Sequence, residues 1–386
     1  MDKIEEVLTR GVEQILPDKK ALAALLAKRR IKLYQGFDPS SPLLHLGHMI
    51  GLRKLAQFQA LGHEVIFLIG DFTGMIGDPT DKAAARKKLT RSQILANFKE
   101  YKNQAGKILR FSGENAAEVK FNSHWLSKLT IEEFLDIASH FTTSQLQERD
   151  MFQERLKAGK SVFAHEFLYP ILQGYDSVAM NVDLEVGGND QLFNMLAGRT
   201  LVKALRGKEK YVLTLKLLTD PTGKKMGKTE GNVINLNNSP TDMYGKIMAL
   251  PDNVTEAGVE LLTDLKASPK NPFDAKKKLA FEVVKQVQGE TKAQAAATFF
   301  EKTFQKGEIP KGIKTLTLKE RALPLLDLVF ATKQVPSRSE AKRLILQGGV
   351  DVGKSTIDDP TREIEIPEGG IVIKIGKIKF VKVRSK

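Results

Sequence analysis

Two histidines three residues apart open the most informative segment of the chain. The segment is His45-Leu46-Gly47-His48, at the start of a helical pattern that runs over 46–60. Residues at i and i+3 share one face of a helix. The first turn of a helix has unpaired N–H groups and the positive end of the helix dipole, so it attracts phosphate. We interpret the segment as a phosphate site; two surface histidines are the alternative, and a metal site is disfavoured because no other ligand cluster accompanies the pair.

A lysine-rich segment carries the second set of residues. Lys225-Met226-Gly227-Lys228-Thr229 follows Asp220-Pro221-Thr222-Gly223, whose Pro and Gly predict a loop that can move. Two lysines on such a loop can close over phosphates and stabilise charge that develops during a reaction. Taken alone, the pattern favours a basic surface loop.

Short apolar runs alternate with longer helical patterns in the first two thirds of the chain. This alternation predicts a mainly parallel sheet with helices on both faces, and ligands bind beyond the carboxyl ends of such strands. Glycine-rich turns at Gly36, 70–77 and 187–188 follow three of the runs, so they are expected to face one cleft. The expected strands are 31–34, 64–69, 118–121, 182–186 and 211–217, and the expected helices are 46–60, 83–111, 131–158 and 190–206.

Three domains are expected. The first covers 1–230, a helical domain covers 231–319, and a small basic module covers 320–386. The residues 321–386 include 13 basic and 8 acidic side chains. Ser337 and Glu340 have the spacing of a capping box, and Gly348-Gly349 marks the helix end. Residues 371–383 alternate apolar and basic side chains around a Gly-Lys pair, as a hairpin does.

The composition limits the classes of protein. The chain has 386 residues, a formal net charge of +14 and no cysteine. Disulfides and thiolate metal sites are therefore excluded, and the basic balance favours a polyanionic partner. The first residues lack the apolar run of a signal peptide, and no stretch approaches the roughly 20 apolar residues of a membrane helix. We expect a cytoplasmic enzyme or RNA-binding protein with no membrane partner.

The two motifs together resemble the signatures of class I aminoacyl-tRNA synthetases. His45–His48 resembles the HIGH motif, Lys225–Thr229 resembles the KMSKS loop, and their separation suits a Rossmann-type doubly wound domain. Four further segments resemble the bacterial tyrosyl branch: 33–40 (LYQGFDPS), 77–79 (GDP), 169–176 (YPILQGYD) and 186–191 (VGGNDQ). The C-terminal module resembles the small α+β RNA-binding domain shared with a ribosomal small-subunit protein.

This resemblance implies an activity with ATP, L-tyrosine and tRNA(Tyr). Tyrosine carboxylate attacks the α-phosphorus of ATP, with Mg²⁺ carried on the phosphates, and the tyrosyl group then moves to the 3′ end of the tRNA. The carboxylate is its own nucleophile, so the protein supplies positioning and positive charge. The resemblance gives the phosphate role to His45, His48, Lys225 and Lys228, and other ATP contacts to Asp38, Gly47, Gly188 and Asp190.

The same resemblance implies a tyrosine pocket with a polar end. Tyr34 and Asp176 would meet the phenol hydroxyl, which both donates and accepts hydrogen bonds. The ammonium group would be held by Asp78, Tyr169 and Gln173. Gly36 would line the pocket, and Gln191 would lie near the reacting carboxyl group. Each of these residues could instead be a core aromatic, a turn former or a helix cap; their joint order favours the pocket.

The C-terminal module is expected to bind tRNA through Arg338, Lys342 and Arg343, because phosphate contacts supply affinity and position. A solvated basic face is the alternative for these three residues. The resemblance also implies a homodimer, although helical patterns such as 131–158 would serve equally well as core.

Three features depart from the family pattern. Gly227 stands where a serine is more common, Gln35 is larger than expected, and the stretch 173–191 is shorter than in many members. A tryptophanyl enzyme, a small-molecule nucleotidyltransferase and a non-catalytic RNA-binding paralogue remain as alternatives. The Tyr34 and Asp176 pair disfavours the first, because an indole N–H only donates.

Overall fold

The computed structural model describes residues 2–78, 89–219, 233–305, 313–376 and 379–386. Its contacts divide the chain into two compact units. Unit 1 comprises Met1–Asn238 and Leu250–Gly289, and unit 2 comprises Ser239–Ala249 and Glu290–Lys386.

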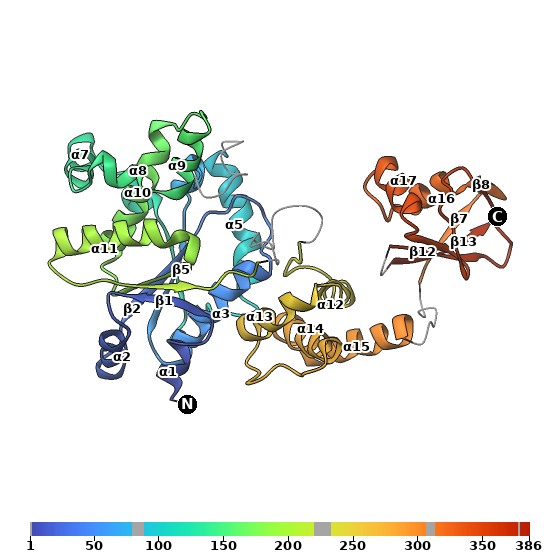
Figure 1. Ribbon diagram of the computed structural model, residues 1–386, viewed down its shortest axis with the longest axis horizontal. Helices are drawn as coiled ribbons and strands as arrows, with labels where there is room; N and C mark the ends of the chain where they lie inside the picture. The colour runs from blue at the N-terminus through green and yellow to red at the C-terminus, as the bar shows by residue number, and fades with distance from the viewer. Residues whose placement is uncertain (1, 79–88, 220–232, 306–312, 377–378) are drawn as a thin grey trace. The chain divides into compact units, whose positions relative to one another are not determined.

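A six-stranded sheet forms the centre of unit 1, in the order β1-β6-β5-β2-β3-β4 (Figure 1). Neighbouring strands from β6 to β4 run parallel, and only the edge strand β1 is antiparallel to its neighbour. The strands are β1 (Val12–Leu16), β2 (Lys32–Phe37), β3 (Glu64–Ile69), β4 (Glu118–Phe121), β5 (Leu184–Gly188) and β6 (Tyr211–Leu215). The expected mainly parallel sheet is confirmed; β1 was not expected.

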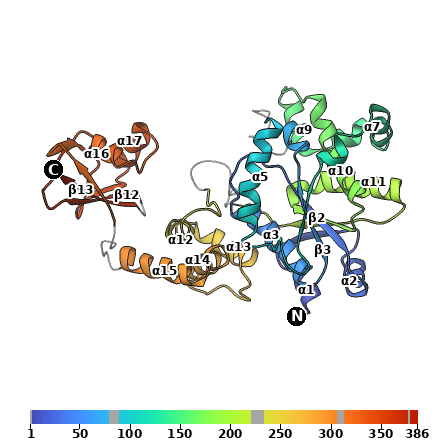
Figure 2. The same ribbon diagram turned by 180° about the vertical axis from the view of Figure 1, so that it is seen from behind.

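Helices cover both faces of this sheet, with α10 and α11 on one side and α3 on the other (Figures 1 and 2). The longer helices of unit 1 are α2 (Lys19–Lys28), α3 (Leu46–Ala60), α5 (Arg91–Ala105), α10 (Ala164–Met180), α11 (Leu192–Arg206), α13 (Asp252–Leu262) and α14 (Pro272–Gln288). The shorter ones are α1 (Lys3–Val7), α4 (Thr73–Ile76), α6 (Ser123–Leu126), α7 (Ile131–Ala138), α8 (Thr143–Gln147), α9 (Asp150–Lys157) and η2 (Asn189–Gln191).

Three helix expectations differ from the structure. The helix expected over 83–111 is α5, which begins at Arg91 and ends at Ala105. The single helix expected over 131–158 is three short helices, because the Thr142 side chain caps a new helix by accepting from Gln145 N–H. The sequence did not predict α10, which contains Pro170. Proline removes one helical hydrogen bond, but α10 packs closely along α11. An added Cβ at Gly174 of α10 would lie 3.1 Å from the backbone of α11, so this glycine permits the contact.

Unit 2 contains α12 (Pro240–Met248) packed on α15 (Glu290–Phe300), followed by the short η3 (Glu301–Gln305). Its C-terminal part is a small α+β module whose five-stranded sheet has the order β10-β9-β12-β13-β7, with β8 and β11 paired separately. The helices α16 and α17 supply Leu325, Leu328 and Ile345 to the core against this sheet. Its elements are β7 (Lys314–Leu318), β8 (Ala322–Pro324), α16 (Leu325–Ala331), α17 (Arg338–Leu346), β9 (Val350–Val352), β10 (Ser355–Thr356), β11 (Glu363–Glu365), β12 (Ile371–Ile375) and β13 (Lys379–Ser385).

The expected C-terminal hairpin is confirmed, since β12 and β13 pair antiparallel. The expected capping box is only half formed. Ser337 Oγ accepts from Glu340 N–H at 3.2 Å, whereas the Glu340 carboxylate accepts from Arg343.

Candidate active site

The two motif histidines lie at the N-terminus of α3. The Nδ1 atom of each ring accepts a hydrogen bond from a backbone N–H of the motif. Gly47 N–H donates to His45 Nδ1 at 3.1 Å, and His45 N–H donates to His48 Nδ1 at 3.2 Å. Because each Nδ1 accepts, each neutral ring carries its proton on Nε2. Both rings are thus arranged as donors beside a helix N-terminus, which suits phosphate oxygens.

Backbone pairing fixes the entrance to α3. Leu46 N–H donates to Ile234 O at 3.1 Å, and Leu236 N–H donates to Leu44 O at 2.8 Å. The second motif lies just before Ile234 in the sequence. Lys225 and Lys228 themselves lie outside the described residues.

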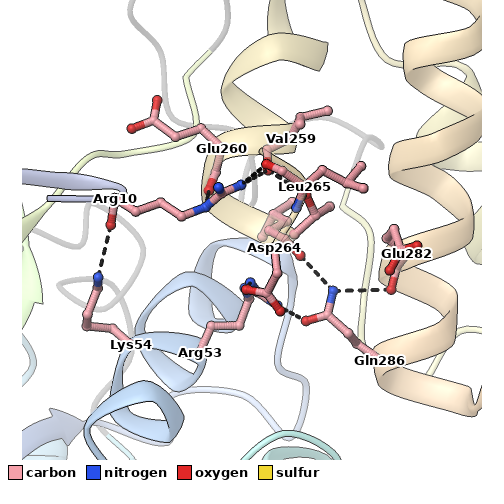
Figure 3. Close-up of polar contacts among 11 residues, drawn as sticks. Arg10, Arg53, Lys54, Val259, Glu260, Asp264, Leu265, Glu282 and Gln286 are labelled. Atoms are coloured by element: carbon pink, nitrogen blue, oxygen red, sulfur yellow. Dashed lines mark hydrogen bonds and ion pairs between the residues drawn. The ribbon is translucent and has the colours of Figure 1, made fainter. Parts of the chain in front are cut away.

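Three cations anchor the middle of α3 to the rest of unit 1 (Figure 3). Lys54 Nζ donates to the carbonyls of Val7 and Arg10 at 2.7 and 2.9 Å. Arg53 pairs with Asp264 at 2.6 Å, and Arg10 donates to carbonyls of residues 259, 260 and 265. Burial, with the charges of Arg53 and Arg10, lowers the pKa of Lys54 to about 7. These contacts hold α3 against α1 and against the C-terminal end of α13 with the residues that follow it.

A buried polar cluster lies between β2 and α10. The Tyr34 hydroxyl is 2.8 Å from Ser177 Oγ, and neither residue is exposed. On the same helix, Asp176 accepts from Trp125 Nε1 at 2.7 Å and from Asn122 Nδ2 at 3.3 Å. Burial raises the pKa of Asp176 well above its usual range, despite these two donors. Sequence reasoning placed Tyr34 and Asp176 together but missed their partners.

A second group joins the residues expected at the ammonium end. Asp38 accepts from the Tyr169 hydroxyl at 2.7 Å and from Thr73 Oγ1 at 2.9 Å. Burial and the nearby Asp38 and Asp78 carboxylates raise the pKa of Tyr169. A Cβ at Gly70 would lie 1.8 Å from Asp38 Oδ1, so this glycine makes room for the carboxylate. Asp38, which the sequence assigned to ATP, is therefore fixed against Tyr169, one of the residues expected to bind tyrosine.

Asn194 of α11 links the remaining pocket residues and was not predicted. Its Nδ2 donates to Gln173 Oε1 at 3.0 Å and to Gln191 Oε1 at 2.9 Å. Gln191 Nε2 donates in turn to Asp78 Oδ2 at 2.7 Å. Asn194 lies three residues after Gln191, a helical spacing that could have indicated it.

Arg149 is a further residue that the sequence did not indicate. It is 5% exposed and lies 3.5 Å from Asp78. Its guanidinium lies over the rings of Phe152 and Phe193, 5.5 and 5.6 Å from their centroids. The cation therefore balances the charge of Asp78 from a largely aromatic environment.

The glycine-rich turn after β5 carries Gly188 and Asp190. A Cβ at Gly188 would lie 2.5 Å from Asp190 Oδ1 and 3.0 Å from Leu217, so a larger residue would displace the Asp190 side chain. Gly36 lies on β2, where an added Cβ would meet only Leu68, at 3.9 Å. The turn expected at Gly36 is therefore part of a strand, and Gly188 is the last residue of β5. Both glycines lie near the carboxyl ends of parallel strands, at the same edge of the sheet.

The basic residues of α17 lie in the C-terminal module. Arg338 pairs with Asp327 and lies over the Phe330 ring, and Arg343 pairs with Glu340. Lys342 is exposed. Two of the three expected RNA contacts thus already make intramolecular ion pairs.

Two kinds of feature are absent from the part of the chain that the structure describes. No three His, Asp or Glu side chains in these ranges are placed to share a metal ion. In the same ranges, no helix is long and apolar enough to cross a bilayer.

Comparison with known proteins gives the family. Residues 26–305 match the tRNA synthetases class I (W and Y), and residues 323–367 match the S4 domain. The chain belongs to this class I synthetase family. The tyrosine–tRNA ligase of Aquifex aeolicus is 39% identical over 98% of this chain and 98% of its own length. That of Photobacterium profundum is 40% identical over 100% of both.

Solved class I synthetases have the same fold. A C-terminally truncated mitochondrial tyrosyl-tRNA synthetase of Coccidioides posadasii superimposes with a TM-score of 0.61 at 26% identity, covering 77% of this chain and 91% of that chain. The tyrosyl-tRNA synthetase of Archaeoglobus fulgidus, complexed with L-tyrosine, gives a TM-score of 0.61 at 20% identity, covering 77% and 99%. The predicted Rossmann-type fold with an S4-type module is therefore confirmed.

Proposed function

We propose that this chain is a tyrosine–tRNA ligase that uses the clusters described above to bind and activate tyrosine. The observation that carries the proposal is the buried polar end between β2 and α10, where Tyr34 bonds to Ser177 and Asp176 accepts from Trp125 and Asn122. A phenol hydroxyl can add a hydrogen bond to these buried groups, whereas a phenyl ring would cover them without one, at a cost of about 1–3 kcal/mol for each group.

The ammonium group of tyrosine binds Asp78, Tyr169 and Gln173. Asp78 supplies the opposite charge, and the other two supply oxygen acceptors. The Asn194 bonds to Gln173 and Gln191 support this arrangement, because they point amide groups from two elements at one place. Gln191 then lies beside the carboxyl group that attacks ATP.

ATP binds at the N-terminus of α3. Gly47 permits close approach of the adenine, and His45 and His48 donate through Nε2 to phosphate oxygens. Gly188 and Asp190 hold the ribose, and Asp38 lies at the ATP side of the tyrosine pocket. Lys225 and Lys228 stabilise charge on the α-phosphate as its fifth bond forms. Mg²⁺ enters with ATP on the substrate phosphates.

The two steps follow from this placement. The tyrosine carboxylate attacks the α-phosphorus, a bond to pyrophosphate breaks, and tyrosyl-adenylate remains. A ribose hydroxyl at the 3′ end of tRNA then attacks the acyl carbon and AMP leaves. The S4-type module binds the tRNA through Arg338, Lys342 and Arg343. The domain boundaries at 230/231 and 319/320 remain predictions from the sequence. A cytoplasmic location is likewise a prediction from the sequence.

Amino-acid-dependent ATP–pyrophosphate exchange tests the activity, with tyrosine, phenylalanine and tryptophan compared in parallel. We expect exchange with tyrosine alone. Exchange with tryptophan would be consistent with a class I synthetase but would make tryptophan, and not tyrosine, its substrate. No exchange with any of the three would favour a non-catalytic RNA-binding paralogue.

We also infer a homodimer, in which α7 lies at the interface. Ile131 and Leu135, four residues apart on this helix, are 80% and 62% exposed. Residues with this spacing share one face of a helix, and adjacent large apolar side chains on a surface mark interaction sites. Light scattering at micromolar concentration is expected to give twice the chain mass of 42.9 kDa, and Leu135→Arg is expected to lower it. A single-chain mass for the unaltered protein would refute the dimer.

A further inference from the structure

Two of the buried cations in unit 1 differ in how completely they are bonded, and Lys210 is the first. Its Nζ forms an ion pair with Glu185 Oε2 and also donates to Met195 O at 2.9 Å. A Cβ at Gly198 of α11 would lie 2.5 Å from this nitrogen, 2.8 Å from Ser177 Oγ and 3.3 Å from Glu185 Oε2, so the glycine keeps the space that these groups fill. The ammonium of Lys210 therefore finds its partners within the chain.

Arg149, the residue just before α9, is bonded much less completely. Its side chain is 5% exposed, yet within the described part of the chain neither Nη1 nor Nη2 has a hydrogen-bond partner. The Asp78 carboxylate balances the charge but lies 3.5 Å from Nη2, which is longer than an ordinary hydrogen bond. A buried charge without hydrogen bonds is costly, so these two nitrogens indicate a partner that the chain itself does not supply.

Two aromatic rings hold the guanidinium of Arg149 in place. It lies 5.5 Å from the ring centroid of Phe152 and 5.6 Å from that of Phe193. Phe152 is fully buried and packs on Phe167, with the ring centroids 4.6 Å apart. Aromatic rings attract a cation but leave its N–H groups unused. The guanidinium is thus preorganised for a planar anion with two oxygens, which is the shape of a carboxylate.

Arg149 lies beside the place proposed for the α-carbon end of tyrosine. Asp78 faces Arg149 with Oδ1 and accepts from Gln191 Nε2 at 2.7 Å with Oδ2. Asp78 is the proposed partner of the ammonium group, and Gln191 is proposed to lie near the carboxyl group. Because both groups of an α-amino acid are attached to one carbon, an ammonium bound to Asp78 brings the carboxylate within reach of Arg149.

The charges on this side of the pocket call for a cation beside the substrate carboxylate. Asp38 accepts from the hydroxyls of Tyr169 and Thr73, which are neutral donors. Both Asp38 and Asp78 lie close enough to Tyr169 to raise its pKa. These two carboxylates attract the ammonium group, but they repel a carboxylate that is fixed beside it. Arg149 is the cation that the structure places against Asp78, and its charge offsets this repulsion.

We propose that Arg149 binds the α-carboxylate of the amino acid through Nη1 and Nη2, while Asp78 binds its ammonium group. The inference rests on the proposed function and deepens it, because it names a recognition site for the reacting carboxylate. The two oxygens of a carboxylate have about four lone-pair sites between them. A carboxylate that accepts two hydrogen bonds from Arg149 therefore keeps a lone pair with which to attack the α-phosphorus.

The test compares two ligands that differ in the carboxylate alone. Tyrosine carries it, and tyramine, the decarboxylated form, keeps the phenol and the ammonium group. ATP–pyrophosphate exchange gives KM for tyrosine, and inhibition of that exchange gives Ki for tyramine. Arg149→Met removes the charge and keeps an apolar stem, whereas Arg149→Lys keeps the charge and loses the paired donors.

Arg149→Met is expected to raise KM for tyrosine roughly 10- to 100-fold, the range for hydrogen bonds to a charged group. Ki for tyramine should be unchanged or lower, because a like charge near its ammonium group is removed. Arg149→Lys should raise KM for tyrosine by a smaller factor and leave Ki for tyramine unchanged. Arg199→Met is the matched control, since it makes the same change on α11, where the guanidinium pairs with Glu209. Both constants should stay unchanged in that variant.

The outcomes separate this inference from the proposed function. If the unaltered protein shows no exchange with tyrosine, the proposed function fails, and this inference fails with it. If exchange occurs and Arg149→Met raises KM for tyrosine and Ki for tyramine by the same factor, Arg149 only shapes the pocket and the inference alone is overturned. An unchanged KM for tyrosine overturns it as well. Should Arg149→Met fail to fold, Arg149→Lys takes its place, and the same two results in that variant overturn the inference equally.

Discussion

The side chains around the proposed substrate are positioned mainly by one another. Asn194 is the clearest case, because one amide group donates to two glutamines on different elements. Its Oδ1 is buried with no hydrogen-bond partner in the described part of the chain. Such an atom costs stability, which indicates that the position of its NH₂ group is what matters.

Asn194→Ala is expected to raise KM for tyrosine by about tenfold, since Gln173 and Gln191 each lose a buried donor and become less ordered. KM for ATP should stay within about twofold because the α3 contacts are untouched. Asn194→Asp serves as the comparison: it keeps the shape, replaces the donor with an acceptor, and is expected to be worse. An unaltered KM for tyrosine in both variants would show that Asn194 does not position the pocket. ATP–pyrophosphate exchange kinetics measure KM for tyrosine and KM for ATP in each variant.

At the scale of elements, the sequence predicted best where hydrophobic periodicity and capping agree. The strand 64–69 and the helix 46–60 have the expected bounds. The prediction failed at α10, where Pro170 and Gly174 argue locally against a helix and close packing on α11 outweighs them. The motifs allowed site residues to be proposed from the sequence, but they gave no indication of Asn194, Trp125 and Arg149. Their roles depend on contacts between distant segments, which no local pattern records.

The anchoring of α3 leads to a prediction about pH. The folded pKa of Lys54 is about 7, against an ordinary value of 10.5. Between these values the unfolded chain binds more protons than the folded chain, so stability rises with pH. Relative to Lys54→Met, the unaltered protein should gain roughly 1.4 kcal/mol per pH unit from about pH 7 upward.

Thermal or urea unfolding at pH 7, 8 and 9 measures this difference. Lys278→Met is the control, since it removes a lysine from the exposed surface of α14. A constant difference between the unaltered protein and Lys54→Met would mean that Lys54 keeps an ordinary pKa in the folded state.

At the scale of the molecule, the residues proposed for amino-acid activation and those proposed for RNA binding lie in different compact units. Every described residue assigned to tyrosine or ATP lies in unit 1, and the proposed RNA contacts lie in unit 2. The two functions should therefore be separable by mutation.

Lys342→Glu is expected to lower kcat/KM for tRNA charging severalfold and to reduce its salt dependence, because one phosphate contact is lost. ATP–pyrophosphate exchange should be unchanged. Lys354→Glu makes the same charge change in a turn of the same module. Equal losses in the two variants would indicate general electrostatic attraction and would contradict a specific role for α17.

The space at Gly198 has an evolutionary consequence. Because one missing methyl group accommodates Lys210, Glu185 and Ser177 together, a change at any of the four positions alters the requirement at the others. Substitutions there should accumulate in concert, and a lineage that loses the buried lysine should soon become free to replace the glycine. In an alignment of relatives, positions 177, 185, 198 and 210 are expected to covary more strongly than the solvent-facing residues of α10 and α11.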